Sequence, residues 1–272
     1  MIILHVALGG CLKAPPVSFG VTGDTGGHIS YVLEAAVHQV ALPDVDQVII
    51  VTRFFEDAEL GDAHRRCHEP VVPGVVIHRL RTANRAYLEK EALDAELPHL
   101  IEAFCDHIAQ LPQRPDVIHA HFADAADLAR AAERRFGIPF VYTPHALGID
   151  KLAQALDSDG IEARIRAERG AITDAAAIIV STRDEAERQI GGYGVHVGER
   201  VHVLPPGVPR RDLVPCEPTL VDRLLREALD MTRDQVLAIP LHHQMRPWAM
   251  KKNITMVHNS NDAPKMFYVT KK

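Results

Sequence analysis

The sequence predicts an α/β fold in which helices cover both faces of a doubly wound parallel sheet. Short runs rich in β-branched residues alternate with longer amphipathic segments through roughly the first 200 residues. Runs such as MIILHVAL and QVIIVTR are almost continuously apolar, which is typical of parallel strands that are buried on both faces. With 272 residues and 47% hydrophobic content, the chain is also large enough to bury such a core.

The first strand, at 1–8, leads into a helix over 27–41, where apolar residues recur with a helical period. The alternation of strand and helix then repeats, except that only a loop is expected between the runs at 47–53 and 75–80. The remaining elements are expected, in chain order, as strands at 47–53 and 75–80, a helix over 88–110, a strand at 116–121, a helix over 124–136, a strand at 139–145, a helix over 160–173, a strand at 176–182, a helix from Arg183 and a strand at 200–207.

The segment LPPGV predicts the end of a first domain, because Pro205, Pro206 and Gly207 cannot continue a strand. Beyond it, PTLVDRLLREALD has a helical pattern and QVLAIPL has the pattern of a new buried strand. We therefore expect one Rossmann-like domain over 1–212 and a second unit over 213–272. The second unit is expected to be incomplete, since a nucleotide-binding domain needs on the order of 100 to 200 residues.

The composition excludes several classes of protein. The net charge is −6 and the Lys and Arg residues are scattered, so nothing predicts contact with a nucleic acid backbone. The apolar N-terminal residues include no basic leader or cleavage site, and no run approaches the roughly 20 apolar residues of a membrane span. We therefore expect a cytoplasmic protein without a membrane partner. The cysteines form no C-x-x-C pair and are expected to be reduced packing residues: Cys11, Cys67, Cys105 and Cys216.

Polar residues collect where the predicted strands end and the helices begin. The segments are GDTGGH, HAHFADA, TPHALGIDK and STRDEAERQ, and each has more polar side chains than a turn needs. In a doubly wound sheet these loops lie at the carboxyl edge of the strands, where they form a crevice. The sequence therefore predicts a binding site at this edge.

Gly26 and Gly27 stand directly before the first helix, although glycine is a poor helix former. One explanation is a tight turn in which Asp24 or Thr25 caps the helix. The other is an anion site, because unpaired amides and the positive end of the helix dipole both face an approaching ligand. The spacing matches neither G-x-G-x-x-G nor G-x-x-x-x-G-K-[ST], so a nicotinamide cofactor and a Walker-type phosphate loop are not supported.

Three histidines are candidate binding groups near the same edge. His119 and His121 alternate along a strand end and so point to one face, with Asp124 about one turn further on. They could hold a metal ion, but buried histidines satisfied by hydrogen bonds are commoner, and no H-E-x-x-H helix is present. We predict no metal site. His145 follows Pro144 at a strand end, where a neutral imidazole could bind a sugar hydroxyl or cap a helix start.

Several motifs, in the same order along the chain, resemble those of one enzyme family. DTGGH at 24–28 matches a D-T-G-G-[QH] loop, and YVLE at 31–34 matches the Y-V-x-E that follows it. The further matches are VTRFFED, NRAYLEKEAL, RPDVIHAHFADAADLA, GIPFVYTPHALGIDK, RIRAE, IIVSTRDE and VLPPGV. Over about residues 1–215 the chain resembles the retaining glycosyltransferases of the sucrose-phosphate synthase, sucrose synthase and mannosylfructose-phosphate synthase type.

This resemblance implies a GT-B architecture of two Rossmann-like domains. The amino-terminal half would hold the acceptor, and the carboxyl-terminal half would hold the donor substrate, a UDP- or GDP-hexose, without any tightly bound cofactor. Gly26 and Gly27 would let backbone amides approach the donor phosphates or sugar, and His145 would be the catalytic residue beside the transferred sugar. The acceptor would be bound by Arg85, Lys90, His121, Asp124 and Arg164, and the leaving diphosphate by Arg246, Lys251 and Lys252.

The resemblance also implies a reaction. A hexose would move from the nucleotide sugar to fructose 6-phosphate or a similar sugar acceptor, with retention at the anomeric carbon. Because the second unit is expected to be incomplete, the 272-residue chain would be inactive or nearly so. It would then need a carboxyl-terminal domain or a homo-oligomeric partner. The alternative is a non-catalytic module that binds a sugar phosphate or has a regulatory role.

Overall fold

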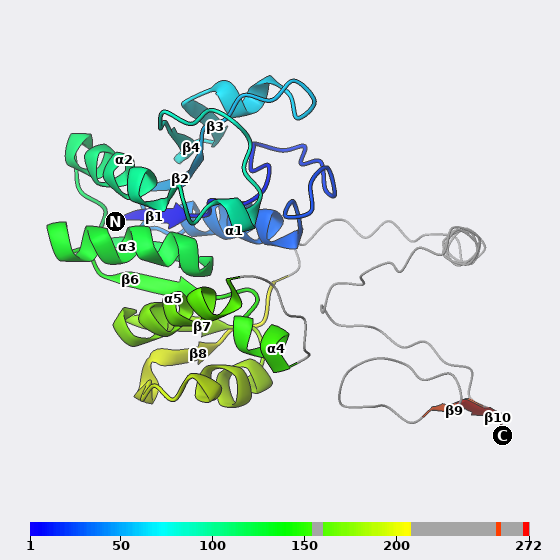
Figure 1. Ribbon diagram of the computed structural model, residues 1–272. Coiled ribbons are helices and arrows are strands. Elements are labelled where there is room, and N and C mark those ends of the chain that lie inside the picture. Colours follow the sequence, from blue (N-terminus) through cyan, green and yellow to red (C-terminus); the bar gives the residue numbers. More distant parts are fainter. Residues whose placement is uncertain (154–159, 208–253, 257–268, 272) are drawn as a thin grey trace. The chain divides into compact units, whose positions relative to one another are not determined.

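The structure is a computed structural model that describes residues 1–153, 160–207, 254–256 and 269–271 (Figure 1). The chain divides into two compact units, Met1–Pro209 and Arg210–Lys272. In the second unit the described residues form an antiparallel pair of strands, β9 (Ile254–Met256) and β10 (Val269–Lys271). The predicted boundary between 212 and 213 lies outside the described residues, as do the helix and the strand expected after it.

The first unit is built on an eight-stranded sheet with the order β3-β4-β2-β1-β5-β6-β7-β8. Its strands are β1 (Ile2–Val6), β2 (Gln47–Arg53), β3 (His68–Val72), β4 (Val75–Leu80), β5 (Val117–His121), β6 (Phe140–Thr143), β7 (Ala177–Val180) and β8 (Val201–Val203). Neighbouring strands pair in parallel, except that β3 runs antiparallel to β4 at one edge. The predicted α/β fold with a doubly wound sheet is confirmed, with one strand more than expected.

Strand β3 corrects the expectation of a plain loop between β2 and β4. It forms a hairpin with β4, and the two-residue turn between them is Pro73-Gly74. Gly74 has a φ of +83°, which residues with a side chain adopt only with strain. A Pro-Gly dipeptide between two β-branched runs is a hairpin signal, so the sequence does contain the information for this strand.

The helices of the first unit are α1 (Gly27–Val40), α2 (Leu97–Gln110), α3 (Phe122–Phe136), α4 (Gly148–Ala153) and α5 (Ile161–Asp174). The expected helix over 88–110 is wrong in its first part, where Lys90–Ala92 form a short 3₁₀ turn before α2 begins. Pro98 explains this boundary, because proline is favoured in the first turn of a helix and breaks a helix interior. Helix α4 is absent from the expected elements, and residues 185–193 form π and 3₁₀ turns instead of a regular helix.

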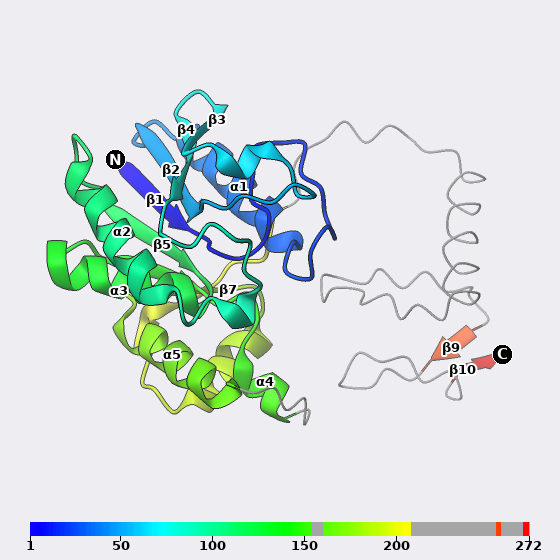
Figure 2. The same ribbon diagram turned by 45° about the horizontal axis from the view of Figure 1, so that its top comes forward.

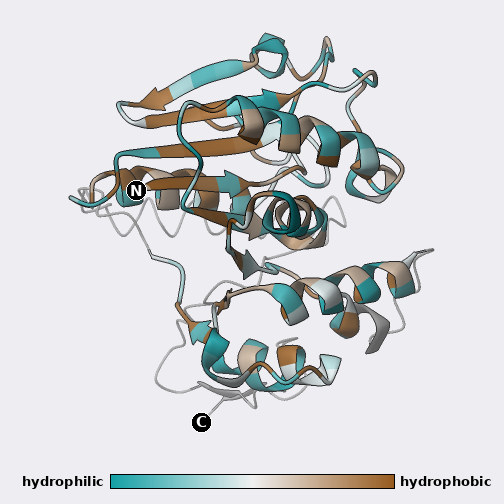
Figure 3. Cartoon of the chain, turned by 90° about the vertical axis from the view of Figure 1, so that its left-hand side faces the viewer, coloured by the Kyte–Doolittle hydropathy of each residue, from teal (hydrophilic) through white to brown (hydrophobic). Residues whose placement is uncertain are grey.

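Helices cover both faces of the sheet, as the two views in Figures 1 and 2 show. Helix α1 packs Ile29, Val32, Leu33 and Ala36 on one face, against β1, β2 and β4. Helices α2, α3 and α5 lie side by side on the other face. Figure 3 shows hydrophobic residues along the central strands and mixed hydrophobic and hydrophilic residues along the helices. Burial on both faces explains why the strands are almost continuously apolar.

None of the described helices is long and apolar enough to cross a lipid bilayer. Cys11, Cys67 and Cys105 are free thiols, as expected, and Cys216 lies outside the described residues.

The strand order places a topological switch point in the middle of the sheet. From β1 the chain winds outward through β2 and β4, and it then crosses to β5 on the other side of β1. In doubly wound sheets, the loops at such a point leave the carboxyl edge in opposite directions, and ligands bind between them. The carboxyl ends of β1 and β5 are therefore the candidate site.

Candidate functional site

Residues from four segments meet at the carboxyl edge of the sheet. Nζ of Lys90 lies 3.8 Å from the centre of the Phe122 ring, at the start of α3. The Phe122 ring centre lies 4.8 Å from that of His145, which follows β6, and 5.1 Å from that of His28, in the first turn of α1. The fold thus brings together three of the polar segments that the sequence singles out, with Lys90 from a fourth segment.

The loop before α1 is braced by Asp24 and Thr25. Oγ1 of Thr25 accepts a hydrogen bond from the amide of Cys11 at 2.9 Å, and Oδ2 of Asp24 accepts one from the amide of Gly10 at 3.2 Å. The hydroxyl of Tyr87 donates to Oδ1 of Asp24. Gly10 has a φ of +77°, and a Cβ there would stand 2.6 Å from the carbonyl oxygen of Asp24. The end of β1 and this loop are therefore in close backbone contact.

Neither Asp24 nor Thr25 caps α1, so the capping alternative is wrong for this helix. The N-cap residue is Gly26, no side chain of the described residues caps the first turn, and that turn contains no acidic residue. A Cβ at Gly27 would meet no atom within 4 Å, so the space beside the first turn is open. The first-turn amides and the positive end of the helix dipole can therefore face an anion.

Two residues of this cluster have backbone conformations that favour glycine. Phe122 has a φ of +70° and His145 a φ of +56°, and in the described part of the chain no other non-glycine residue has a positive φ. Strained conformations of this kind cost about 1 to 3 kcal/mol each and persist where the surrounding structure holds them, most often at functional sites. The ends of β5 and β6 thus hold two neighbouring rings in strained positions.

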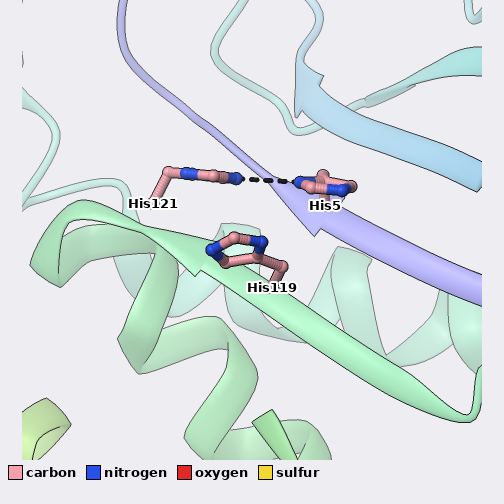
Figure 4. Close-up of side chains that lie close together, drawn as sticks. All are labelled: His5, His119 and His121. Atoms are coloured by element: carbon pink, nitrogen blue, oxygen red, sulfur yellow. Dashed lines mark hydrogen bonds between the residues drawn. The ribbon is translucent and has the colours of Figure 1, made fainter. Parts of the chain in front are cut away.

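A row of histidines runs from the interior of the sheet to His145. His5 of β1 lies opposite His119 of β5 in the parallel register, and His121 points to the same face. Nδ1 of His5 lies 2.9 Å from Nε2 of His121 (Figure 4), and Nδ1 of His121 lies 2.9 Å from Nε2 of His145. At the other end of the row, Nε2 of His5 lies 2.6 Å from Oε1 of Gln39 in α1.

Burial lowers the pKa of these histidines. The pKa of His5 falls to about 4, and the pKa values of His119 and His121 fall well below 6.5. The pKa of His145 falls to about 3, because burial and then the nearby charges, including that of Lys90, disfavour a second positive charge. The rings are therefore neutral at pH 7, and each has one donor and one acceptor nitrogen.

Asp124 lies in the first turn of α3, next to this cluster. Its Oδ1 is inaccessible to solvent and has no hydrogen-bond partner among the described residues. Burial raises the pKa of Asp124, while the charge of Lys90 and the amide of Ala125 act in the opposite direction. A buried carboxylate oxygen without a partner is unusual, and it could accept a hydrogen bond from a ligand hydroxyl.

Arg164 contacts the backbone directly after His145. Its Nη2 donates to the carbonyl of Ala146 at 2.7 Å, and its Nε donates to Oε1 of Glu168 at 2.8 Å. Glu168 is 1% exposed and also accepts a hydrogen bond from the amide of Gly148, at the start of α4, at 2.9 Å. Arg164 therefore braces the segment that holds His145.

Arg85 is not brought into this cluster by the contacts that the structure describes. Arg85 pairs with Glu56 at 3.3 Å and lies over the Phe54 ring at 5.2 Å, and its side chain is 48% exposed. The residues predicted to hold the leaving diphosphate lie outside the described residues: Arg246, Lys251 and Lys252. Their binding roles, like those of the residues above, stay predictions.

Residues 26–207 match the family described as the glycosyl transferase 4-like domain. This chain belongs to that family. A probable sucrose-phosphate synthase from Vicia faba is 26% identical over 275 residues, which cover 79% of this chain and 26% of that protein. Probable sucrose-phosphate synthase 1 from Oryza sativa subsp. japonica is 29% identical over 227 residues, which cover 70% and 21%. The chain thus spans about a quarter of the length of these relatives.

Solved structures share the fold of this glycosyl transferase 4-like domain. Sucrose-phosphate synthase from Thermosynechococcus elongatus superposes with a TM-score of 0.64 at 19% identity, over 87% of this chain and 52% of that chain. Anabaena HepE in complex with UDP-glucose gives a TM-score of 0.52 at 16% identity, over 85% and 50%. The predicted resemblance, and the fold of a GT-B amino-terminal half, are confirmed.

Among the described residues of this glycosyl transferase 4-like domain, one group could offer nitrogens to a metal ion. His5, His119 and His121 each supply a ring nitrogen, and these lie within 4.8 Å of one another. Two nitrogens on one tetrahedral Zn²⁺ stand about 3.3 Å apart, whereas those of His5 and His121 are 2.9 Å apart. Nε2 of His119 also lies 2.7 Å from Oγ1 of Thr143. The group is arranged for hydrogen bonds, which a metal would have to break.

His5 and Gln39 are the residues of this site that the sequence motifs miss. His5 lies inside an apolar run and is therefore read as part of a buried strand. Gln39 lies near the end of an amphipathic helix. The available signal is the face of the strand to which His5 points. Whether this is the face to which His119 and His121 point follows only from the register of β1 on β5.

Proposed function

We propose that the chain forms the acceptor-side half of a retaining glycosyltransferase. A hexose moves from a nucleotide sugar, a UDP- or GDP-hexose, to fructose 6-phosphate or a similar sugar acceptor, with retention at the anomeric carbon. One observation carries the proposal. In a chain of the glycosyl transferase 4-like family, the uncapped start of α1, Lys90 and a neutral His145 meet at the switch point of the sheet.

The charges that develop in this reaction match the chemistry of the cluster. Positive charge builds on the sugar ring while the diphosphate leaves as an anion, so amides and cations aimed at the diphosphate lower the barrier. Gly26 and Gly27 supply amides at the positive end of α1. His145 contacts the transferred sugar, and because its pKa is lowered to about 3, it forms hydrogen bonds without placing a positive charge beside the ring. The leaving diphosphate is also held by Arg246, Lys251 and Lys252.

The acceptor lies on the other side of His145. Lys90 binds the acceptor phosphate, since a phosphate needs charged donors. Arg164 uses Nε and Nη2 within the protein, so its contribution comes from Nη1. The remaining acceptor contacts come from Arg85 and Asp124. His121, predicted from the sequence as a further acceptor group, has both ring nitrogens in contact with His5 and His145 and acts through His145 instead. Nucleotide sugars and sugar phosphates are metabolites of the cytoplasm, which is therefore the proposed location.

Lys90→Ala tests the acceptor site. The substitution should weaken binding of fructose 6-phosphate by about 1.5 to 3 kcal/mol, which is the effect of losing a hydrogen bond to a charged group. Binding of fructose should change little. Arg166→Ala is the control, since it removes a cation that is 71% exposed and pairs with Glu162 at 3.9 Å. Calorimetry measures the affinities of the wild type and of both variants for the two sugars, and equal losses for both sugars in Lys90→Ala would show that Lys90 only supports the fold.

Turnover separates an enzyme from a binding module. The 272-residue chain is assayed with fructose 6-phosphate and UDP- or GDP-glucose, alone and joined to a complete nucleotide-binding domain. We expect nucleotide release from the longer version, because a donor site closed to water strengthens the interaction between the leaving diphosphate and the cations that bind it. Ligand-dependent stabilisation without nucleotide release from either version would instead favour a non-catalytic sugar-phosphate module.

A further inference from the structure

The hydrogen bonds along the histidine row beneath His145 are all donated in one direction. This direction is set by Gln39, which lies at the far end of the row. Oε1 of Gln39 can only accept a hydrogen bond, so Nε2 of His5, 2.6 Å away, must carry the proton and donate. A neutral imidazole has one donor and one acceptor, which makes Nδ1 of His5 an acceptor. Nε2 of His121 lies 2.9 Å from that nitrogen and must therefore donate.

The same reasoning applies to the next link of the row. Nδ1 of His121 becomes the acceptor, and Nε2 of His145, 2.9 Å away, must donate to it. The argument requires neutral rings, and burial provides them by lowering the pKa of each one. His5 and His121 are fully buried, so bulk water does not compete for these bonds.

We propose that Gln39, His5 and His121 form a one-way hydrogen-bond relay that holds His145 in its Nε2–H tautomer. Nδ1 of His145 then carries the lone pair, on a ring that is only half-buried. A ligand hydroxyl can donate to this nitrogen, whereas a ligand acceptor gains nothing there. Gln39, His5 and His121 are positioning residues, and the step from tautomer to sugar hydroxyl rests on the proposed function.

The surroundings of His145 fit this role. The Tyr31 ring stands edge-on to the His145 ring, with the centres 5.1 Å apart, so the imidazole is held from the side as well. The hydrogen bond that His145 donates to His121 also helps to hold the strained backbone of His145 at a φ of +56°. His119 takes no part in the row, because its Nε2 contacts Oγ1 of Thr143 at 2.7 Å.

Substitutions at Gln39 test the direction of the relay without touching a histidine. Gln39 is only partly buried in α1, so the helix should tolerate other long side chains. A glutamate can only accept and should preserve the direction, whereas a lysine can only donate and should reverse every bond. A methionine at this position removes the hydrogen-bond acceptor of His5 and should leave both tautomers of His145 populated. His38→Lys is the matched control, since it adds the same charge at a neighbouring, 71% exposed position of α1.

The readout is the pair of ¹⁵N chemical shifts of the His145 ring in the full chain, which report the tautomer and require no activity. We expect the Nε2–H form in the wild type, in Gln39→Glu and in His38→Lys, and the Nδ1–H form in Gln39→Lys. An Nδ1–H ring in the wild type would overturn the proposal. An unchanged ring in both Gln39→Lys and Gln39→Met would overturn it as well.

Ligand affinity separates this proposal from the proposed function. Gln39→Lys should weaken binding of UDP-glucose or fructose 6-phosphate about tenfold, the loss expected when one hydrogen bond to a sugar hydroxyl is no longer matched. A reversed tautomer with unchanged affinity for both ligands would support the relay, and it would contradict the placement of His145 beside the sugar.

Discussion

Replacing His64 by phenylalanine should make the first unit more resistant to acid. His64 lies in the 3₁₀ turn Asp62–Arg65, is 2% exposed, and stacks on the ring of Phe55 with the centres 4.4 Å apart. Its Nδ1 is buried without a hydrogen-bond partner in the described part of the chain. Burial, and then the charge of Arg79, lowers the pKa of His64 from 6.5 to about 4.

This lowered pKa gives both the sign and the size of the effect. The unfolded ring takes up a proton at a higher pH than the folded ring, so the free energy of unfolding falls as the pH falls from about 6.5 toward about 4. At about pH 5 the unfolded ring is almost fully protonated and the folded ring is neutral. A gap of about 1.5 pH units corresponds to about 2 kcal/mol, which His64→Phe should abolish.

Urea unfolding at about pH 7.5 and about pH 5, followed by circular dichroism, measures this difference. The wild type should lose about 2 kcal/mol more stability between the two conditions than His64→Phe does. His99→Phe is the matched control, because it makes the same replacement at a histidine whose side chain is 70% exposed. The same pH dependence in the wild type and in His64→Phe would refute the reasoning.

Gly10→Ala should lower the free energy of unfolding by at least about 2 kcal/mol, because it places a side chain at positive φ and a Cβ 2.6 Å from the carbonyl oxygen of Asp24. Urea unfolding checks this against Gly23→Ala, whose Cβ would meet no atom within 4 Å and should cost little. Gly27→Asp should leave the fold intact, since a Cβ there meets nothing within 4 Å, but its carboxylate should weaken UDP-glucose binding about tenfold or more by repelling the diphosphate. Calorimetry with Gly27→Asn as the uncharged control measures this, and equal affinity in both variants would contradict an anion site.

The central strands could be predicted from the sequence because their environment imposes a simple pattern. β1 and β2 are buried on both faces and are therefore continuously apolar, which distinguishes them from the amphipathic helices. Strand β3 is an edge strand with the sequence HEPVV, and its half-exposed, mixed pattern resembles a loop. The start of α2 expected from the sequence is too early, because the amphipathic period extends upstream of Pro98, whereas α2 begins with this proline in its first turn.

The candidate site was predictable only in part. The segments at the carboxyl edge are visible as polar clusters after apolar runs, and His145 lies within one of them. Lys90 lies outside these clusters and is indicated by the family resemblance alone. The sequence indicates Arg164 as an acceptor-binding candidate but does not show that two of its three donor groups contact Glu168 and the Ala146 carbonyl. A side chain's internal partners depend on neighbours that lie far away in the sequence.

The sequence by itself determined the alternation of strands and helices, the edge at which polar groups collect and the family of the domain. These depend on local periodicity and on motifs within short segments. Only the tertiary structure decided that His5, His121 and His145 are joined to Gln39. His5 and His121 are 116 positions apart and meet only because β1 pairs with β5 in one register. A shift of that register by one residue would turn His5 to the opposite face relative to its partners, so the relay is a property of the sheet and not of any motif.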